Sequence, residues 1–315
     1  MGPGMFALPT ADYDFAPSIE RFRRRLNEQF RAAVISSFLP AFEERYAQRK
    51  RLPPPDFTAR IGQGDELLAA LQSSGYGLGA LPLERIRKLR ELIWPLAAEI
   101  HAELDAIETP KFEAGQRRLG SLEGPVAEQL SEGLTECGAL DAASAYMGCS
   151  LKLGRMVLQV NTVRETRSRF GELDAFGRPQ RTTSYFHVDS SHWPNVKALV
   201  YLDEVGPDQG PFRYVVGSHR LMSPYEAAVR KTNDKLGHGV DKLCALPPEY
   251  GQHANFGDYI DPNSLGALRL LNQEVVVCDG HSDLIVFDNN GVHRGGMVRK
   301  GRRYMLQCLF ERVGR

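Results

Sequence analysis

The chain has 315 residues, of which 42% are hydrophobic and 25% charged, a composition typical of a globular protein with a sizeable core. Its 39 Lys and Arg balance 39 Asp and Glu, so the formal net charge is zero. This balance argues against a nucleic-acid partner, because phosphate binding needs a basic face. No apolar run reaches the roughly 18 residues of a membrane helix, and no secretory signal is visible. We therefore expect a cytoplasmic protein with no membrane partner.

The five cysteines are odd in number and include no Cys-x-x-Cys pair. This pattern indicates neither a disulfide framework nor a structural zinc site.

Residues 1–55 are predicted to be a helical extension. Apolar residues recur there at offsets of three and four, which places them on one stripe of an amphipathic helix, at Ile19, Phe22, Leu26, Phe30 and Val34. The prolines at 53–55 end any helix at that point. Such a stripe serves an interface as readily as a core, so the sequence predicts no oligomeric state.

Residues 56–315 are predicted to form the main domain, with helices over 56–150 and strands from 151 onward. A helical segment begins near Leu67, and a second one covers 83–94. The later part holds short apolar runs separated by Gly, Asp and Asn, at 157–163, 197–203, 212–216, 274–278, 283–287 and 303–310. This spacing is typical of a β-sandwich or jelly roll. The expected fold class is mainly β with helical additions (α+β).

Two long connections interrupt the strands, at 164–183 and 221–266. Both exceed the usual loop length of about 4 to 6 residues. Such insertions are binding loops or lids, or else ordered surface decoration.

The most informative motif is His187-Val188-Asp189, followed 104 positions after the aspartate by His293. In a strand, alternate side chains share a face, so His187 and Asp189 point the same way. Two imidazoles and one carboxylate can occupy one face of an octahedral ferrous ion and leave three positions open. These three residues are the candidate metal ligands.

The surroundings of this motif resemble the phytanoyl-CoA dioxygenase-like family of iron(II)/2-oxoglutarate-dependent oxygenases. The likeness runs from about Glu66 to Phe310 and includes the helical lead-in, the His-x-Asp pair, the turn at 217–219 and the Gly/Asp-rich approach to His293. It implies a double-stranded β-helix (jelly roll, cupin-like) core flanked by helices. It also implies Fe(II), 2-oxoglutarate and O2, with hydroxylation of an unactivated C–H bond of a small molecule and release of succinate and CO2.

The same resemblance implies that Arg303, ten residues after His293, grips the distal carboxylate of 2-oxoglutarate. A planar guanidinium binds a carboxylate through two parallel hydrogen bonds. The stretch between His293 and Arg303 lacks the hydroxyl residue that the family often carries beside the histidine. Arg299 and Arg302 therefore stay open as alternatives.

Gln159 and Asn161 alternate with apolar residues and share one strand face. Amides that point into a sandwich need partners, so both are candidates for cosubstrate binding. Trp193, Tyr185 and Arg181 lie close to the metal motif in the sequence and are candidates for the substrate pocket. His219 is expected to hold its turn rather than a metal.

Two other classes remain. A redox-neutral, cupin-like hydrolase or isomerase would use zinc or manganese at the same triad and would have no need for Arg303. The other class is a metal-free β-sandwich that binds a ligand without turnover. The carboxylate of Asp189 argues against halogenation, whereas desaturation, epimerisation and ring formation stay open, as does the identity of the substrate.

Overall fold

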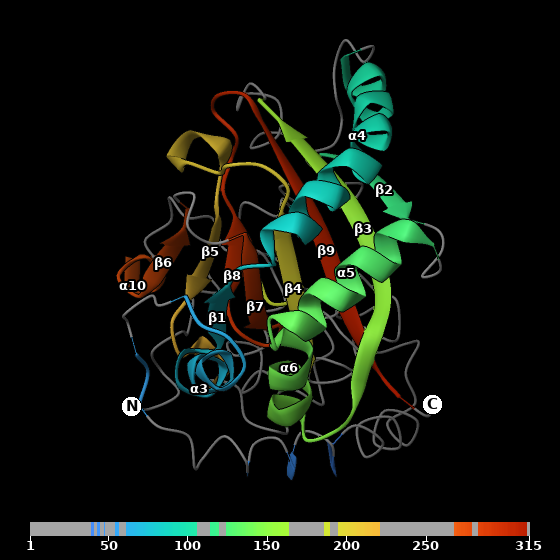
Figure 1. The fold of residues 1–315 in the computed structure, drawn as a ribbon. Helices are drawn as coiled ribbons and strands as arrows, with labels where there is room; N and C mark the ends of the chain where they lie inside the picture. Colours follow the sequence, from blue (N-terminus) through green and yellow to red (C-terminus); the bar gives the residue numbers. More distant parts are fainter. Residues whose placement is uncertain are drawn as a thin grey trace, which may run out of the picture.

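A computed structural model places the chain as two antiparallel sheets beside a layer of helices (Figure 1). It describes residues 39–40, 43–44, 47, 54–56, 61–105, 114–119, 124–163, 186–189, 195–220, 268–278 and 283–313, with the backbone alone for 104, 114–119 and 269. The amphipathic helix expected over 19–34 and both long connections lie outside these residues.

The helices of the described part are α3 (Asp65–Ser74), α4 (Leu83–Asp105), α5 (Pro125–Glu136), α6 (Ala139–Met147) and α10 (Leu268–Leu271), with short 3-10 turns η4 (Pro207–Gln209) and η5 (Ser218–Arg220). The strands are β1 (Tyr76–Gly79), β2 (Ala114–Leu119), β3 (Leu151–Thr162), β4 (Val196–Tyr201), β5 (Phe212–Val215), β6 (Glu274–Val277), β7 (Leu284–Asp288), β8 (His293–Gly295) and β9 (Arg302–Arg312).

The larger sheet has the strand order β1-β7-β4-β9-β3-β2, and the smaller one has the order β6-β5-β8. Every pair of neighbouring strands is antiparallel. Strands distant in the sequence are neighbours in space, since β4 lies between β7 and β9. This order brings the late strands, which carry the His293 segment, beside the earlier ones.

Helices α4, α5 and α6 cross one face of the larger sheet, in front of β3, β9 and β4 in Figure 1. The apolar residues of α4 fall at offsets of three and four, which places them on the stripe that packs against the sheet, at Ile86, Leu89, Ile93, Ala97 and Ile100. Sheet residues such as Leu158 and Leu306 complete this core from the other side. We call this helix-covered side of the larger sheet its outer face.

The opposite, inner face packs against the smaller sheet. Phe212 and Tyr214 of β5 form a buried cluster with residues of the larger sheet that include Leu199, Phe287 and Met305. A hydrogen bond also joins the two sheets, because the backbone N–H of Phe212 donates to the Tyr201 hydroxyl at 2.8 Å. Side chains alternate along each strand, so residues in register with this cluster also face the space between the sheets.

The structure confirms α3 and the strand expected after the metal motif, which is β4. It differs at the motif itself, where His187 makes only an isolated bridge with His293 and residues 188–189 lie outside any strand. It also differs in the segment expected to be helical. In that segment, β1 and β2 are strands, and each forms one edge of the larger sheet. Strand β1 has four residues, two of them glycine, and is too short for a periodic signal; β2 contains two arginines and a glutamine. Helix α4 also continues past Pro95 to Asp105. Among the described helices, none pairs the length with the apolar character that crossing a bilayer demands.

Candidate metal centre

His187 and His293 lie opposite each other at a point where two backbone segments pair. Each donates its backbone N–H to the carbonyl of the other at 2.9 Å, which makes an isolated antiparallel bridge next to β8. The two ring centroids are 4.5 Å apart, and both side chains are buried. Backbone pairing therefore brings together two imidazoles that are far apart in the sequence.

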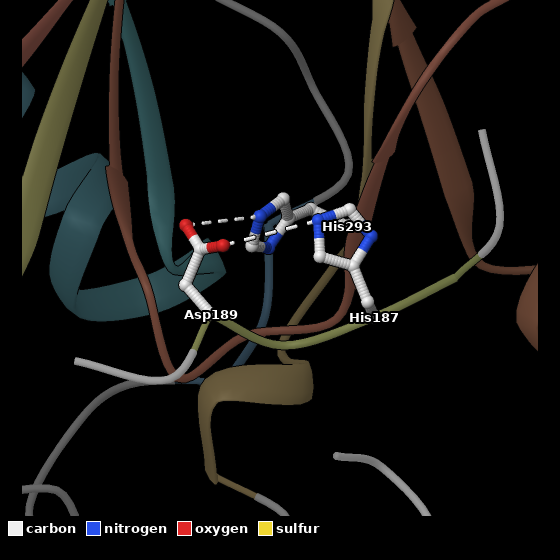
Figure 2. A group of neighbouring side chains, drawn as sticks. All are labelled: His187, Asp189 and His293. Atoms are coloured by element: carbon white, nitrogen blue, oxygen red, sulfur yellow. Dashed lines mark ion pairs between the residues drawn. The ribbon is translucent and has the colours of Figure 1, made fainter. Parts of the chain in front are cut away.

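Asp189 completes the group, and in Figure 2 its carboxylate points toward both rings. Its Oδ1 lies 3.9 Å from Nε2 of His187, and its Oδ2 lies 3.4 Å from Nε2 of His293. One donor atom from each of the three residues lies within 4.8 Å of the others. Donors that bind one ion at about 2 Å are roughly 3 to 4 Å apart, so small side-chain movements would place all three on one cation.

His293 is oriented by its own loop. Its Nδ1–H donates to the carbonyl oxygen of Gly291 at 2.9 Å, which leaves the Nε2 lone pair available on the side of Asp189. Histidines that bind metals are commonly held through the other ring nitrogen in this way. The Tyr214 ring also lies parallel to the imidazole, with 10° between the ring planes and 6.5 Å between the centroids.

Gly291→Ala is expected to disturb this arrangement. A Cβ at position 291 would lie 1.7 Å from the Tyr214 hydroxyl oxygen, and Tyr214 is fully buried. We expect the free energy of unfolding to fall by about 1 to 3 kcal/mol, as for other overpacked sites, which urea denaturation of the metal-free protein would measure. Gly206→Ala is the control, since its Cβ meets only the end of the Gln209 side chain, at 3.1 Å. Equal stability of the two variants would contradict the expectation.

The loop before His293 is also tied to the rest of the molecule. Asp288, which is buried, accepts a hydrogen bond from the Tyr146 hydroxyl of α6 at 2.7 Å and another from the backbone of Asn290 at 2.8 Å. The Ser218 hydroxyl accepts the N–H of Val292 at 2.7 Å. The turn at 217–219 therefore supports the His293 segment.

The Asp189 carboxylate has a positively charged neighbour that the sequence analysis did not single out. Lys197 of β4 places its Nζ in contact with Oδ2 of Asp189. Burial by itself raises the pKa of Asp189, but Lys197, His293 and His187 together hold that pKa well below its usual value. Asp189 is therefore ionised at neutral pH, as a metal ligand must be.

This depressed pKa predicts a pH-dependent stability of the metal-free protein. A carboxylate whose pKa is lower in the folded state stabilises that state above its unfolded pKa of about 4. The stabilisation is lost as the pH falls through the folded value. Asp189→Asn should therefore lower the free energy of unfolding at pH 7, and the difference from wild type should shrink below about pH 4. Urea denaturation with a chelator at several pH values would test this; a difference independent of pH would contradict it.

Arg303 lies on the inner face of the larger sheet, as do Gln159 and Asn161. All three are buried. Arg303 Nη2 donates to Oδ1 of Asn161 at 3.0 Å, and Gln159 contacts Gln307 through a hydrogen bond. The structure thus places the three expected cosubstrate residues on one face, and protein partners satisfy part of their hydrogen bonding.

The structure separates the candidate arginines. Arg302 Nη2 reaches Asp105 of α4 at 2.8 Å, on the outer side, while Arg303 is buried against the inner face. Arg299 is exposed, and its backbone N–H donates to Asp208. Of the three, Arg303 alone lies between the sheets.

The expected substrate-pocket residues Trp193, Tyr185 and Arg181 lie outside the described residues. His219 is fully buried in its turn, next to Gly75, which agrees with a structural role. The sequence did not predict that Lys197 lies at the metal centre, although the alternation of its strand contained a hint of this. In the run from Lys197 to Tyr201, alternation puts this charge on the same face as Leu199.

Comparison with models of known protein families finds no match for this sequence, and none of the curated proteins matches it either. Solved structures do match. EctD from S. alaskensis, crystallised with bound Fe, aligns over 84% of this chain and 83% of its own, with a TM-score of 0.50 and 17% identity. The chain shares the fold of EctD. At this identity the likeness concerns the fold and carries no activity with it.

Two further structures are similar at lower TM-scores. AviO1 from Streptomyces viridochromogenes Tue57 aligns over 82% of this chain and 98% of its own, with a TM-score of 0.48 and 14% identity. The epimerase SnoN, solved in complex with Fe3+, alpha ketoglutarate and nogalamycin RO, aligns over 78% of this chain and 82% of its own, with a TM-score of 0.43 and 16% identity.

Proposed function

We propose that this chain is an iron(II)- and 2-oxoglutarate-dependent dioxygenase that oxidises a small molecule, with hydroxylation of an unactivated C–H bond as its reaction. The observation that carries the proposal is the meeting of His187, Asp189 and His293 with their donor atoms within 4.8 Å of one another. The core of the proposed enzyme is a double-stranded β-helix, which the packing of two antiparallel sheets through one cluster supports.

The donor set fits Fe(II). Two neutral imidazoles and one carboxylate make up the combination typical of non-haem iron oxygenases, and three positions stay open for other ligands. The hydrogen bond from His293 to Gly291 and the ionised state of Asp189 prepare both side chains to bind a cation. Bound iron would activate O2 for oxidation of the substrate. 2-Oxoglutarate would supply the other two electrons that the reduction of O2 requires.

The other residues of the site would bind and orient 2-oxoglutarate and the substrate. Arg303 would hold the distal carboxylate of 2-oxoglutarate, because a buried guanidinium between the sheets binds such a group through two hydrogen bonds. Asn161, which already accepts a hydrogen bond from Arg303, would keep the guanidinium in place. We assign Gln159 to the same site, and Trp193, Tyr185 and Arg181 to the substrate pocket.

One of the similar structures agrees with the proposal that the site binds iron. EctD, with which the chain shares its fold, is described with bound Fe.

Anaerobic titration of the metal-free protein with Fe(II) and then 2-oxoglutarate tests the proposal. The chelate of the two is expected to give a weak visible charge-transfer band in wild type. Iron binding without the band would favour the redox-neutral metal enzyme, and no metal binding would refute the metal centre. Release of succinate with consumption of O2 would then identify substrates.

A further inference from the structure

Lys197 is a charged side chain in an apolar setting at the candidate metal centre. Within the larger sheet it pairs with Phe287 of β7 on one side and with Leu309 of β9 on the other. Phe287 faces the smaller sheet, where its ring centroid lies 5.0 Å from that of His293. Because residues in register share a face, Lys197 also faces the space between the sheets.

The ammonium group of Lys197 has one ionic partner among the described residues, which is Asp189. The Lys197 side chain is 14% exposed and touches Oδ2 of the carboxylate. An ammonium that is largely removed from water is stable only when it is paired. In the metal-free protein, Asp189 provides this pairing.

A divalent cation changes this balance. Bound to His187, Asp189 and His293, it would share the carboxylate that neutralises Lys197 and would bring two further positive charges beside the ammonium. The resulting cluster has an excess of positive charge in a poorly solvated place, where such an excess is costly. An anion within reach of both Lys197 and the metal would relieve it.

We propose that Lys197 is an anion-binding residue of the metal centre, which holds a carboxylate group of the small molecule bound beside the metal. This inference rests on the proposed function. Two sources offer that group: the 2-oxo acid itself, or an acidic substrate. In both cases Lys197 provides a charge-assisted hydrogen bond to a carboxylate oxygen once the metal has bound Asp189.

Lys197 is distinct from the cation expected to bind the distal end of 2-oxoglutarate. Its partner on β9 is Leu309, whereas Arg303 lies six residues earlier on that strand. At roughly 3.3 Å per residue this amounts to about 20 Å between the two backbone positions. The inner face therefore offers two separate cationic positions, with Lys197 next to the metal ligands.

Three variants test the assignment. Lys197→Met keeps much of the length of the side chain and removes its charge, whereas Lys197→Arg keeps a charged donor. Lys152→Met is the matched control. Lys152 lies on β3, its side chain is 58% exposed, and its Nζ pairs with Glu311 of β9 at 3.3 Å. Thermal melting of each metal-free protein shows whether it folds.

The binding of Mn(II) is measured first. Lys197→Met should bind Mn(II) as tightly as wild type or more tightly, because the ammonium no longer competes for Asp189. A loss of Mn(II) affinity in this variant would show that Lys197 orients Asp189 instead, and it would overturn the proposal.

Two arms then identify the carboxylate, both with Mn(II)-loaded protein and without O2. Calorimetry measures the Kd of 2-oxoglutarate in the first arm. In the second, with 2-oxoglutarate saturating, the relaxation of acetate protons by Mn(II) reports on a second carboxylate near the metal. Lys197→Met should raise the Kd by about tenfold or more in one arm, as expected for loss of a charge-assisted hydrogen bond, while Lys197→Arg and Lys152→Met change it much less.

An effect in the first arm assigns Lys197 to the 2-oxo acid, and an effect in the second assigns it to an acidic substrate. Absence of an effect in both arms, including failure of acetate to bind near the metal in wild type, overturns the proposal. Failure of wild type to bind Mn(II) at all would refute the proposed function itself, so the two failures are distinguishable.

Discussion

Asp189→Asn and His293→Gln proteins are each expected to bind Fe(II) at least about 100-fold more weakly than wild type and to release no succinate. Even the loss of a residue that merely supports a metal ligand lowers affinity by about 10- to 100-fold, and these substitutions remove ligands themselves. Asp189→Asn also leaves the buried ammonium of Lys197 without its carboxylate. Anaerobic equilibrium dialysis with a competing chelator would measure the affinity.

Matched substitutions away from the triad serve as controls. His101→Gln changes a histidine of α4 whose ring lies edge-on to Trp94 and is tilted against Tyr304. Asp141→Asn changes an exposed carboxylate of α6. Both controls should bind Fe(II) like wild type. Normal Fe(II) binding by Asp189→Asn or His293→Gln would place the metal elsewhere and remove the main support for the proposed oxygenase.

Arg303→Met is expected to raise the Kd of 2-oxoglutarate by about 100-fold while Fe(II) binding stays unchanged. Truncation of one partner of a buried charge pair costs about 2 to 5 kcal/mol, and the guanidinium is the group proposed to hold the distal carboxylate. Arg303→Lys should have an intermediate effect, because an ammonium keeps the charge but lacks the two parallel donors. Calorimetry on the anaerobic protein loaded with Fe(II) would measure both.

The neighbouring arginine provides a strict control. Arg302 lies next to Arg303 on β9 but pairs with Asp105 on the outer side. Arg302→Met should therefore leave the Kd of 2-oxoglutarate within about twofold of wild type, since the Arg302 side chain faces the helices and not the space between the sheets. If Arg302→Met weakens 2-oxoglutarate and Arg303→Met does not, the assignment of the arginine is wrong.

Where a local pattern was long and periodic, the sequence predicted the structure. The helix expected at 83–94 and the alternation expected at 157–163 correspond to α4 and β3, and both follow from contacts between residues a few positions apart. The pattern missed β1 and β2, since a four-residue strand and a polar strand have too little periodicity. It also ended α4 too early, because packing in the core outweighs the local cost of Pro95.

At the candidate site, the amino-acid pattern was enough to predict which residue types take part and which of them share a face. The pair His187 and Asp189 was recognisable from its spacing, and so was the face shared by Gln159 and Asn161. Both inferences were drawn from the two-residue period of a strand, which is a local property of the chain. Gln159 and Asn161 do lie on such a strand, whereas residues 188–189 lie outside any strand.

Which of these faces meet became known from the folded chain. His187 pairs with His293 through backbone bonds, Asp288 receives the hydroxyl of Tyr146 from a distant helix, and Lys197 contacts Asp189. Such contacts depend on the order of strands in the two sheets and on where the loops reverse the chain. The order of the strands results from the packing of the whole core, so a linear pattern of residues does not contain it. For this reason the contact of Lys197 with the metal centre was seen only in the folded chain.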